Sequence, residues 1–216
     1  DFLKRHHDTN ALHYWANWCL CNIAAKMAIG IVTDRRDIYN EGIDHLQTGD
    51  TNGRLRRAIY HDYAPDYNFA QWQESGRDQG HTLMCVGLMG VICQLAWSQG
   101  DDFFAYDDNL FMRACEYAAC CNYTNETVPY TTYIWQKQSQ WGYPIPEEQT
   151  TLGGGKWIKR AIWALPYYHY KGIKNISDDN LKYTKIATEY VGIEGGGGYY
   201  DANSGGYDVL GLGTFC

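Results

Sequence analysis

The sequence contains no run of eighteen consecutive apolar residues and therefore predicts no membrane-spanning helix. Basic residues are also scarce: 18 Lys and Arg stand against 25 Asp and Glu, for a formal net charge of −7. Such a balance argues against a general affinity for nucleic acid or for acidic membranes. A local arginine cluster could still bind an acidic polymer. We therefore predict one soluble globular domain over residues 1–216, with neither nucleic acid nor membrane as a partner.

Metal and nucleotide signatures are absent as well. No Cys-x-x-Cys spacing suggests zinc, and the glycine-rich stretch 194–213 carries no Gly-Lys-Ser/Thr and follows no clear strand. Neither a cofactor nor a metal is predicted.

Eight cysteines are compatible with a secreted, oxidised protein. Four lie in apolar helical patterns and are predicted to be buried thiols, namely Cys19, Cys21, Cys85 and Cys93. The other four are the better candidates for disulfides: Cys115, Cys120, Cys121 and Cys216. Three glycosylation sequons, at Asn122, Asn125 and Asn175, agree with an extracellular location. The opening Asp-Phe-Leu-Lys-Arg has the character of a mature or trimmed N-terminus.

Six stretches are predicted to be helical. The first carries apolar residues at spacings of three and four, Thr33-Asp34 breaks and caps the second, and the third is apolar nearly all round. These helices cover residues 10–32, 35–46, 81–97, 107–121, 156–170 and 178–190, with a kink at Pro166. Residues 47–69 and 122–155 show no clear period, and no strand alternation is evident. We expect a mainly α fold of stacked helical hairpins joined by long irregular loops.

Two stretches concentrate chemically useful side chains. Gln71–Thr82 holds Arg77 and His81 four residues apart, which on a helix places them on one face. In Arg160–Tyr170, Arg160 and Tyr167 are seven apart, two helical turns and about 10 Å of rise. These pairs could hold an anion and move a proton. The alternative is a buried polar network that ties helices together.

Aromatic residues are abundant, with 19 Tyr and 8 Trp. Their flat apolar faces match the faces of sugar rings while their polar edges form hydrogen bonds. Carbohydrate binding is one interpretation, and an aromatic core is the other.

Six motifs resemble the alginate lyase superfamily, and most closely its glucuronan and alginate lyases of polysaccharide lyase family thirty-eight. In chain order they are Ala16-Asn17-Trp18, Met27-Ala-Ile-Gly-Ile before Asp34-Arg35-Arg36, Gln73-Glu-Ser-Gly-Arg-Asp-Gln-Gly-His-Thr82, Val128-Pro-Tyr-Thr-Thr-Tyr133, Arg160-x-x-Trp163 leading to Tyr167-x-His-Tyr170, and Asn203-Ser-Gly-Gly-Tyr-Asp208. The resemblance implies a partial α/α toroid. Because the family's enzymes are longer, it also implies that their N-terminal hairpins are missing here, so that a companion chain could supply them.

The resemblance further implies β-elimination in a 1,4-linked polyuronate such as glucuronan or mannuronate-rich alginate. Asn17 and His81 would neutralise the uronate carboxylate, Arg160 would add a cation, and Tyr167 would transfer the proton. For guluronate, His81 would act as the base. The side chains expected to contact the acidic polysaccharide are Arg77, Trp18, Tyr130, Tyr133 and His169.

Two other functions stay open from the sequence. One is a non-catalytic carbohydrate-binding or structural protein on a shortened lyase scaffold. The other is a hydrolase that uses two carboxylates such as Glu74 and Asp78.

Overall fold

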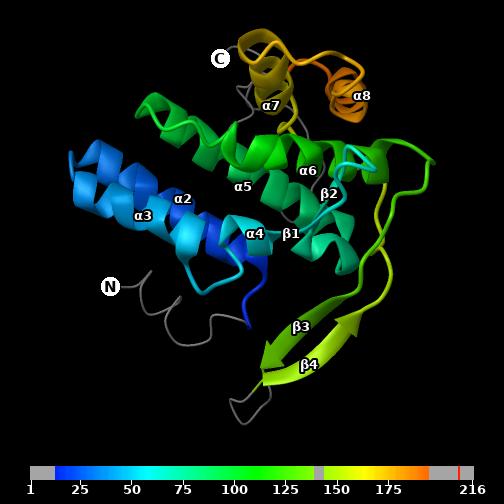
Figure 1. Ribbon diagram of the computed structural model, residues 1–216, viewed down its shortest axis with the longest axis horizontal. Coiled ribbons are helices and arrows are strands. Elements are labelled where there is room, and N and C mark those ends of the chain that lie inside the picture. Colours follow the sequence, from blue (N-terminus) through cyan, green and yellow to red (C-terminus); the bar gives the residue numbers. More distant parts are fainter. Residues whose placement is uncertain (1–12, 139–143, 195–208, 210–216) are drawn as a thin grey trace.

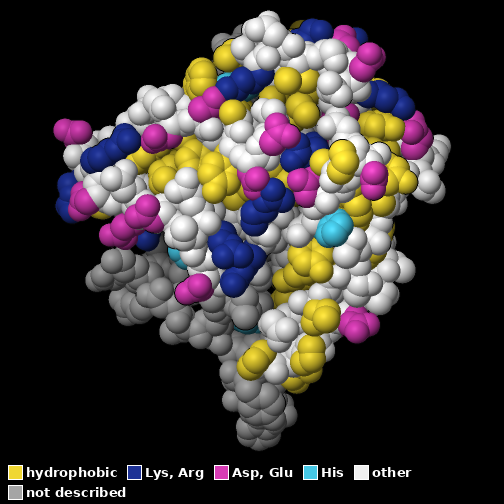
Figure 2. Space-filling view, in the orientation of Figure 1, with side chains coloured by type: hydrophobic (Ala, Val, Ile, Leu, Met, Phe, Trp, Pro, Cys, Tyr) yellow, Lys and Arg dark blue, Asp and Glu magenta, His cyan; other side chains and the backbone are white. Residues whose placement is uncertain are grey.

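The computed structural model describes residues 13–138, 144–194 and 209, and its architecture is mainly α, as predicted. Figure 1 shows a body of packed helices from which one β-hairpin extends. The glycine-rich stretch beyond Glu194, the Asn203–Asp208 motif and Cys216 lie outside the described residues. Acidic and basic side chains are interspersed over the face shown in Figure 2.

The first hairpin consists of α2 (Ala16–Val32) and α3 (Arg36–Thr48), joined by a three-residue turn. Both helices were predicted, α2 from its apolar period and α3 from the Thr33-Asp34 break that precedes it. The two backbones approach closely at Gly30, where a Cβ atom would lie 2.5 Å from the backbone nitrogen of Tyr39. Tyr39 and Leu46 bury the inner side of α3 against α2.

The central element is α5 (Gln79–Ser98), which packs against α2 on one side and α6 on another. By length and composition it could cross a membrane, with a mean hydropathy of 1.4 over its most apolar window. Sixty-one per cent of that window is buried inside the protein, so α5 acts here as a core helix.

The partner of α5 is α6 (Tyr106–Tyr123), whose first turn is irregular. Asp107, Asp108 and Asn109 have φ between 54° and 58°, so regular helix begins only at Leu110. Arg113 holds this turn, because its guanidinium donates to the carbonyl oxygens of Asp107 and Asp108. It also donates two hydrogen bonds, of 2.9 and 2.8 Å, to the carboxylate of Asp62.

Short strands occupy the stretches predicted to be irregular. A four-residue helix, α4 (Leu55–Ala58), leads into β1 (Ile59–Asp62), which pairs antiparallel with β2 (Ala70–Trp72). Further along, β3 (Tyr133–Gln138) pairs antiparallel with β4 (Pro144–Gln149). The prediction of no strands was wrong. In β4, Pro144 and Pro146 interrupt the sequence pattern that is typical of a strand. A two-stranded hairpin tolerates proline, since each strand has a free edge.

The last predicted helical stretches are shorter than expected. The chain is not helical from Lys156 to Trp163; it then forms α7 (Ala164–Tyr168), the π-helical turn η2 (His169–Ile173) and α8 (Lys182–Val191). Pro166 lies in the first turn of α7, where its missing N–H costs nothing, and causes no mid-helix kink. The prediction of one helix over 156–170 was therefore wrong.

The described cysteines form no disulfide. Six of these thiols are buried (Cys19, Cys85, Cys93, Cys115, Cys120 and Cys121), and Cys21 is exposed. The expected disulfide pairing of Cys115, Cys120 and Cys121 is thus not supported. Apolar surroundings explain their burial, since Cys115 and Cys120 lie on α6 within the hydrophobic core.

We expect Gly30→Ala to destabilise the protein by about 1–3 kcal/mol, because the added methyl group must push α3 away from α2. Urea denaturation measures the change in the free energy of unfolding. Gly172→Ala is the matched control, since a Cβ atom at Gly172 meets no atom within 4 Å. Equal effects of the two substitutions would contradict the close approach.

Candidate functional site

The first turn of α5 is organised by the carboxylate of Asp78, the N-cap residue. Its Oδ1 accepts the backbone N–H of His81 at 2.8 Å, and its Oδ2 lies 2.6 Å from His81 Nδ1. Burial works to raise the pKa of Asp78, but the His81 hydrogen bonds and the charges of His81 and Arg77 hold it below its usual value. Asp78 is therefore ionised at neutral pH and fixes the orientation of the imidazole.

The other imidazole nitrogen of His81 is available for chemistry. Nε2 makes no hydrogen bond to any part of the chain that the structure describes, and 22% of the side chain is exposed. A partly exposed histidine that is held through Nδ1 by a carboxylate, with its other nitrogen not hydrogen-bonded to the described residues, has the arrangement of a general base.

Arg77 and His81 come together, although not in the way the sequence predicted. Arg77 precedes α5, so the two residues do not share a helical face. Instead, Asp78 Oδ2 lies 3.9 Å from Arg77 Nε as well as beside His81. The Arg77 guanidinium also lies 3.4 Å from Glu74 Oε2 and stacks over the Trp15 ring at 5.1 Å.

Glu74, in the 3₁₀ turn η1 (Gln73–Gly76), is fully buried and ties this region to α2. Its Oε1 accepts the backbone N–H of Asn17 at 3.1 Å, while Gln73 Oε1 accepts that of Ala16 at 2.9 Å. Burial raises the pKa of Glu74 to about 7, despite the Asn17 hydrogen bond and the Arg77 charge. The start of α2 is thus capped by two side chains that are distant in sequence.

The side-chain amide of Asn17 has few hydrogen-bond partners among the described residues. It is only 5% exposed, and its Oδ1 accepts no hydrogen bond from the described residues. Within the part of the chain that the structure describes, the one hydrogen-bond partner of its Nδ2 is the sulfur of Met84, at 4.0 Å. A buried amide without good partners costs about 1–3 kcal/mol, so it calls for an explanation such as a bound ligand or water.

Arg160 joins this group from the far end of the chain. It is buried, and its Nη2 lies 4.0 Å from the point where a Cβ atom on Gly80 would stand. The same point is 3.2 Å from Asp78 Oδ1. We call Asn17, Glu74, Arg77, Asp78, His81 and Arg160 together the His81 site.

Tyr167 lies elsewhere. After Arg160 the chain runs along α5 towards the C-terminal end of that helix. Ile162 lies next to Gly87 of α5, and Leu165 lies next to Gly90. Ten helical residues separate Gly80 from Gly90, a rise of about 15 Å. Tyr167 faces α8 and lines a cavity of about 340 Å³ with Lys185 and Thr188, and burial raises its pKa. The structure therefore does not place Tyr167 with His81.

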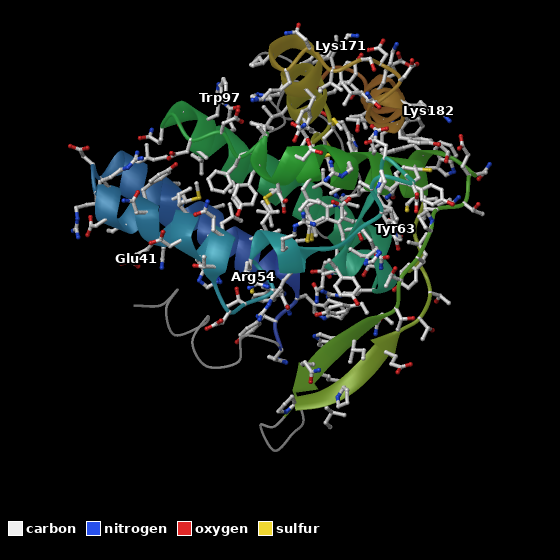
Figure 3. All side chains as sticks on the ribbon, in the orientation of Figure 1. Glu41, Arg54, Tyr63, Trp97, Lys171 and Lys182 are labelled. Atoms are coloured by element: carbon white, nitrogen blue, oxygen red, sulfur yellow. The ribbon has the colours of Figure 1, made fainter. Side chains whose placement is uncertain are left out.

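His169 is farther still. Its ring stacks on Phe104, with 3.6 Å between ring centroids, and meets the edge of Trp97 at 4.9 Å. Figure 3 marks Trp97 at the C-terminal end of α5, opposite the His81 site. His169 Nε2 is buried without a hydrogen bond to any described residue. The predicted sugar contact is instead a core residue.

The other predicted sugar contacts divide between two places. Trp18 is 54% exposed on α2, one residue after Asn17. Tyr130 and Tyr133 flank η1: Tyr133 Oη accepts a 2.9 Å hydrogen bond from Gln73 Nε2, and Tyr130 Oη donates to the carbonyl oxygen of Gln149. Burial raises the pKa of Tyr133 and raises that of Tyr130 to about 12, which favours structural phenols.

Sequence reasoning missed an aromatic stack beside Arg77. The rings of Trp15 and Trp135 are stacked at 4.5 Å, which attaches the β3–β4 hairpin to the site. It also missed the loop before Gly155, where a Cβ atom on Gly153 would lie 2.6 Å from the backbone of Arg77. The consecutive glycines 153–155 were the available signal for this close approach.

The three sequons differ in accessibility. Asn122 is fully buried, and its Nδ2 donates to Gln79 Oε1 and to the carbonyl oxygen of Ala118. A glycan therefore cannot be attached to Asn122 in this fold. Asn125 and Asn175 are exposed.

Comparisons with known protein families, with curated proteins and with solved structures find no match. The chemistry must therefore be argued from the site itself. The His81 site combines two guanidinium groups, the Asn17 amide with few hydrogen-bond partners among the described residues, and an imidazole oriented by a carboxylate. Such a set can bind a carboxylate and move a proton next to it. Over residues 13–138, 144–194 and 209, no cluster of three His, Cys, Asp or Glu could hold a metal ion.

The structure engages both carboxylates that the hydrolase alternative requires in contacts within the protein. Glu74 is buried against the start of α2, and Asp78 is hydrogen-bonded to His81. Neither is free to act as the acid or the nucleophile of a glycosidase pair.

Glu74→Gln should change how stability depends on pH. Folded Glu74 keeps its proton up to about pH 7, whereas an unfolded Glu releases it near the ordinary pKa of 4.5. The folded state thus binds more protons in this window, and the free energy of unfolding falls by up to roughly 3 kcal/mol as pH rises through it.

Glutamine keeps an acceptor for the Asn17 N–H but cannot titrate, so the variant should lose this part of the slope. Urea denaturation at several pH values measures it. Exposed Glu148→Gln on β4 is the control. An unchanged slope in Glu74→Gln would contradict the raised pKa.

His169→Phe should make the protein more resistant to acid. Burial, helped by Lys174, lowers the pKa of His169 to about 4 from its ordinary value of 6.5. The unfolded chain binds the proton first, so stability falls by up to roughly 3 kcal/mol between pH 6.5 and 4. Phenylalanine keeps the stack on Phe104 and removes the titration. Melting temperatures measured at several pH values between 6.5 and 4 test this prediction. If the melting temperature falls by the same amount in parent and variant, the prediction is refuted.

Proposed function

We propose that this chain is a polysaccharide lyase that cleaves a 1,4-linked polyuronate by β-elimination at the His81 site. The observation that carries the proposal is the Asp78–His81 pair next to Arg77, in which His81 is partly exposed and its Nε2 has no hydrogen bond to the described residues. The motif from Gln73 to Thr82, which resembles the alginate lyase superfamily, is the stretch that builds this site. Glucuronan and mannuronate-rich alginate are the proposed substrates.

In the proposed reaction, Nε2 of His81 takes the proton from C5 of the uronate. The electron pair forms the C4=C5 double bond, and the C4–O4 bond breaks. The imidazolium then returns its proton to the departing O4 when the two groups lie on the same side of the ring, as in glucuronate and mannuronate. Asp78 positions the imidazole and stabilises its positive charge.

The main barrier is the second negative charge that develops on the uronate carboxylate. Arg77 and Arg160 supply positive charge, and the amide of Asn17 supplies a donor that makes no strong hydrogen bond to the described residues. Preorganised donors of this kind give the largest catalytic contribution in many enzymes. The unsatisfied amide is consistent with a residue kept ready for substrate.

We also infer that the hairpins around α5 form part of an α/α toroid. The outer side of α2 exposes Trp18, Ile29 and Val32, which supports a further hairpin, from this or a companion chain, packing there. Exposed sequons at Asn125 and Asn175 support an extracellular location.

The second candidate is a protein that binds polyuronate without cleaving it. The position of Tyr167 favours it: the phenol expected to transfer the proton faces the α7–α8 cavity instead of His81. In that case the His81 site would hold the carboxylate and do no chemistry.

Incubation with glucuronan and with alginate separates the two candidates. The lyase should release unsaturated ends that absorb ultraviolet light, and His81→Gln should reduce this rate by roughly 10²-fold or more, the usual contribution of a general base. Tyr167→Phe should retain the rate. Circular dichroism checks that each variant is folded.

A folded chain that binds both polymers and yields no product would favour the binding protein. Loss of activity in Tyr167→Phe together with full activity in His81→Gln would overturn the assignment of His81 as the base.

A further inference from the structure

A second group of aromatic side chains reaches the surface beyond the end of α6. The buried ring of Tyr123 supports the rings of Trp157 and Tyr190, with centroid distances of 6.4 and 5.2 Å. Trp157 and Tyr190 are themselves 5.6 Å apart and are 44% and 40% exposed. Together with Lys159 they form what we call the Trp157 patch.

The backbone of Trp157 is held in a costly conformation. Its φ of 61° lies in the left-handed region, which is unfavourable for a bulky residue. A 2.8 Å hydrogen bond from its N–H to the carbonyl oxygen of Asn122 maintains it. Nearly half of the residue is still exposed, which is unusual for a tryptophan whose backbone is strained. Strained positions of this kind concentrate at binding sites.

Positive charge accompanies the exposed rings. Lys159 Nζ stands 5.5 Å from the centre of the Tyr190 ring. Lys156 is exposed nearby, and its Nζ donates a 2.8 Å hydrogen bond to the carbonyl oxygen of Thr124. In a protein with a net charge of −7, two lysines thus lie beside two exposed aromatic faces.

We propose that the Trp157 patch binds an acidic saccharide at a place separate from the His81 site. The faces of Trp157 and Tyr190 would stack on the apolar face of a sugar ring, and Lys159 would pair with its carboxylate. Aromatic faces alone could stack on any sugar ring. The positive charge of the lysines favours sugars that carry a carboxylate. This charge complementarity identifies the occupant.

The patch and the His81 site are neighbours, because Lys159 belongs to the patch and Arg160, whose charge acts on Tyr123, belongs to the His81 site. Their contacts with α5 are nevertheless on different sides of that helix. Asn122, whose carbonyl holds Trp157, donates its side-chain N–H to Gln79 Oε1. Gln79 and His81 are two positions apart, and each helical residue turns by about 100°, so their side chains leave α5 on opposite sides. The patch would therefore anchor a second part of an acidic chain and would not belong to the cleavage chemistry.

The test is calorimetric titration of the His81→Gln protein, made in a bacterial host, with an oligoglucuronate and with a neutral glucose oligomer of the same length. Trp157→Gly removes the ring and relieves the left-handed φ, so the strain that it removes offsets part of the packing that it loses, and circular dichroism checks that the variant is folded. We expect it to bind the oligoglucuronate about 10-fold more weakly, as expected for the loss of one aromatic contact. Lys159→Gln should remove most of the preference for the acidic over the neutral oligomer.

Trp97→Ala is the matched control. Trp97 is 37% exposed, with Lys174 Nζ 5.4 Å from its ring centre, but it lies at the other end of α5. Its replacement should leave binding unchanged. Equal binding by Trp157→Gly and the parent, or an equal loss in Trp97→Ala, would overturn the proposal.

A glycan on Asn125 is the competing occupant, because Asn125 Oδ1 is 3.5 Å from Lys156 Nζ. Repeating the titration with glycosylated protein decides between the glycan and the acidic saccharide as occupant of the patch. If the glycosylated protein still binds the oligoglucuronate, the proposal is supported; if binding is lost, the proposal is refuted. The readout is binding without turnover, so these results are independent of whether the parent protein cleaves polyuronate.

Discussion

The contact on which the rest of the site depends is the one between the buried Glu74 carboxyl group and the start of α2. It fixes η1 against α2, and through Arg77 it fixes the residues that lead into α5. Asp78 and His81 follow within one turn, so their geometry is set by where η1 sits. The start of α2 is thus held against the residues before α5 by Glu74, together with Gln73, and the chemistry at this junction depends on that contact.

The same arrangement recurs at two other helix starts. Glu116 accepts the backbone N–H groups of Tyr183 and Thr184 at the beginning of α8, and Glu194 accepts those of Trp163 and Ala164 at the beginning of α7. Burial raises the pKa of all three glutamates. None of these helices has a side-chain cap from its own N-cap residue. Helix capping in this protein is therefore largely tertiary, made by glutamates from other elements.

This explains what the sequence could and could not predict. Apolar patterns located α2, α5 and α6, and the Thr33-Asp34 break located α3, because each of these signals lies in the local sequence. Caps from distant glutamates leave no local signal, so the shortened α7 and α8 were not foreseen. Arg160 and Tyr167 looked like neighbours only on the assumption of a continuous helix, and the irregular stretch before Ala164 separates them. Asp78 and His81 were predictable as a group because both lie in one turn.

The absence of disulfides among the described cysteines has a consequence for how the fold can be observed. Six thiols are shielded between helices and one, Cys21, faces solvent. A thiol-reactive label would therefore modify Cys21 at once, and the others only when neighbouring helices separate. The chain thus carries its own reporters of local opening, distributed over α2, α5 and α6, and the order in which they react would map which helix contacts break first.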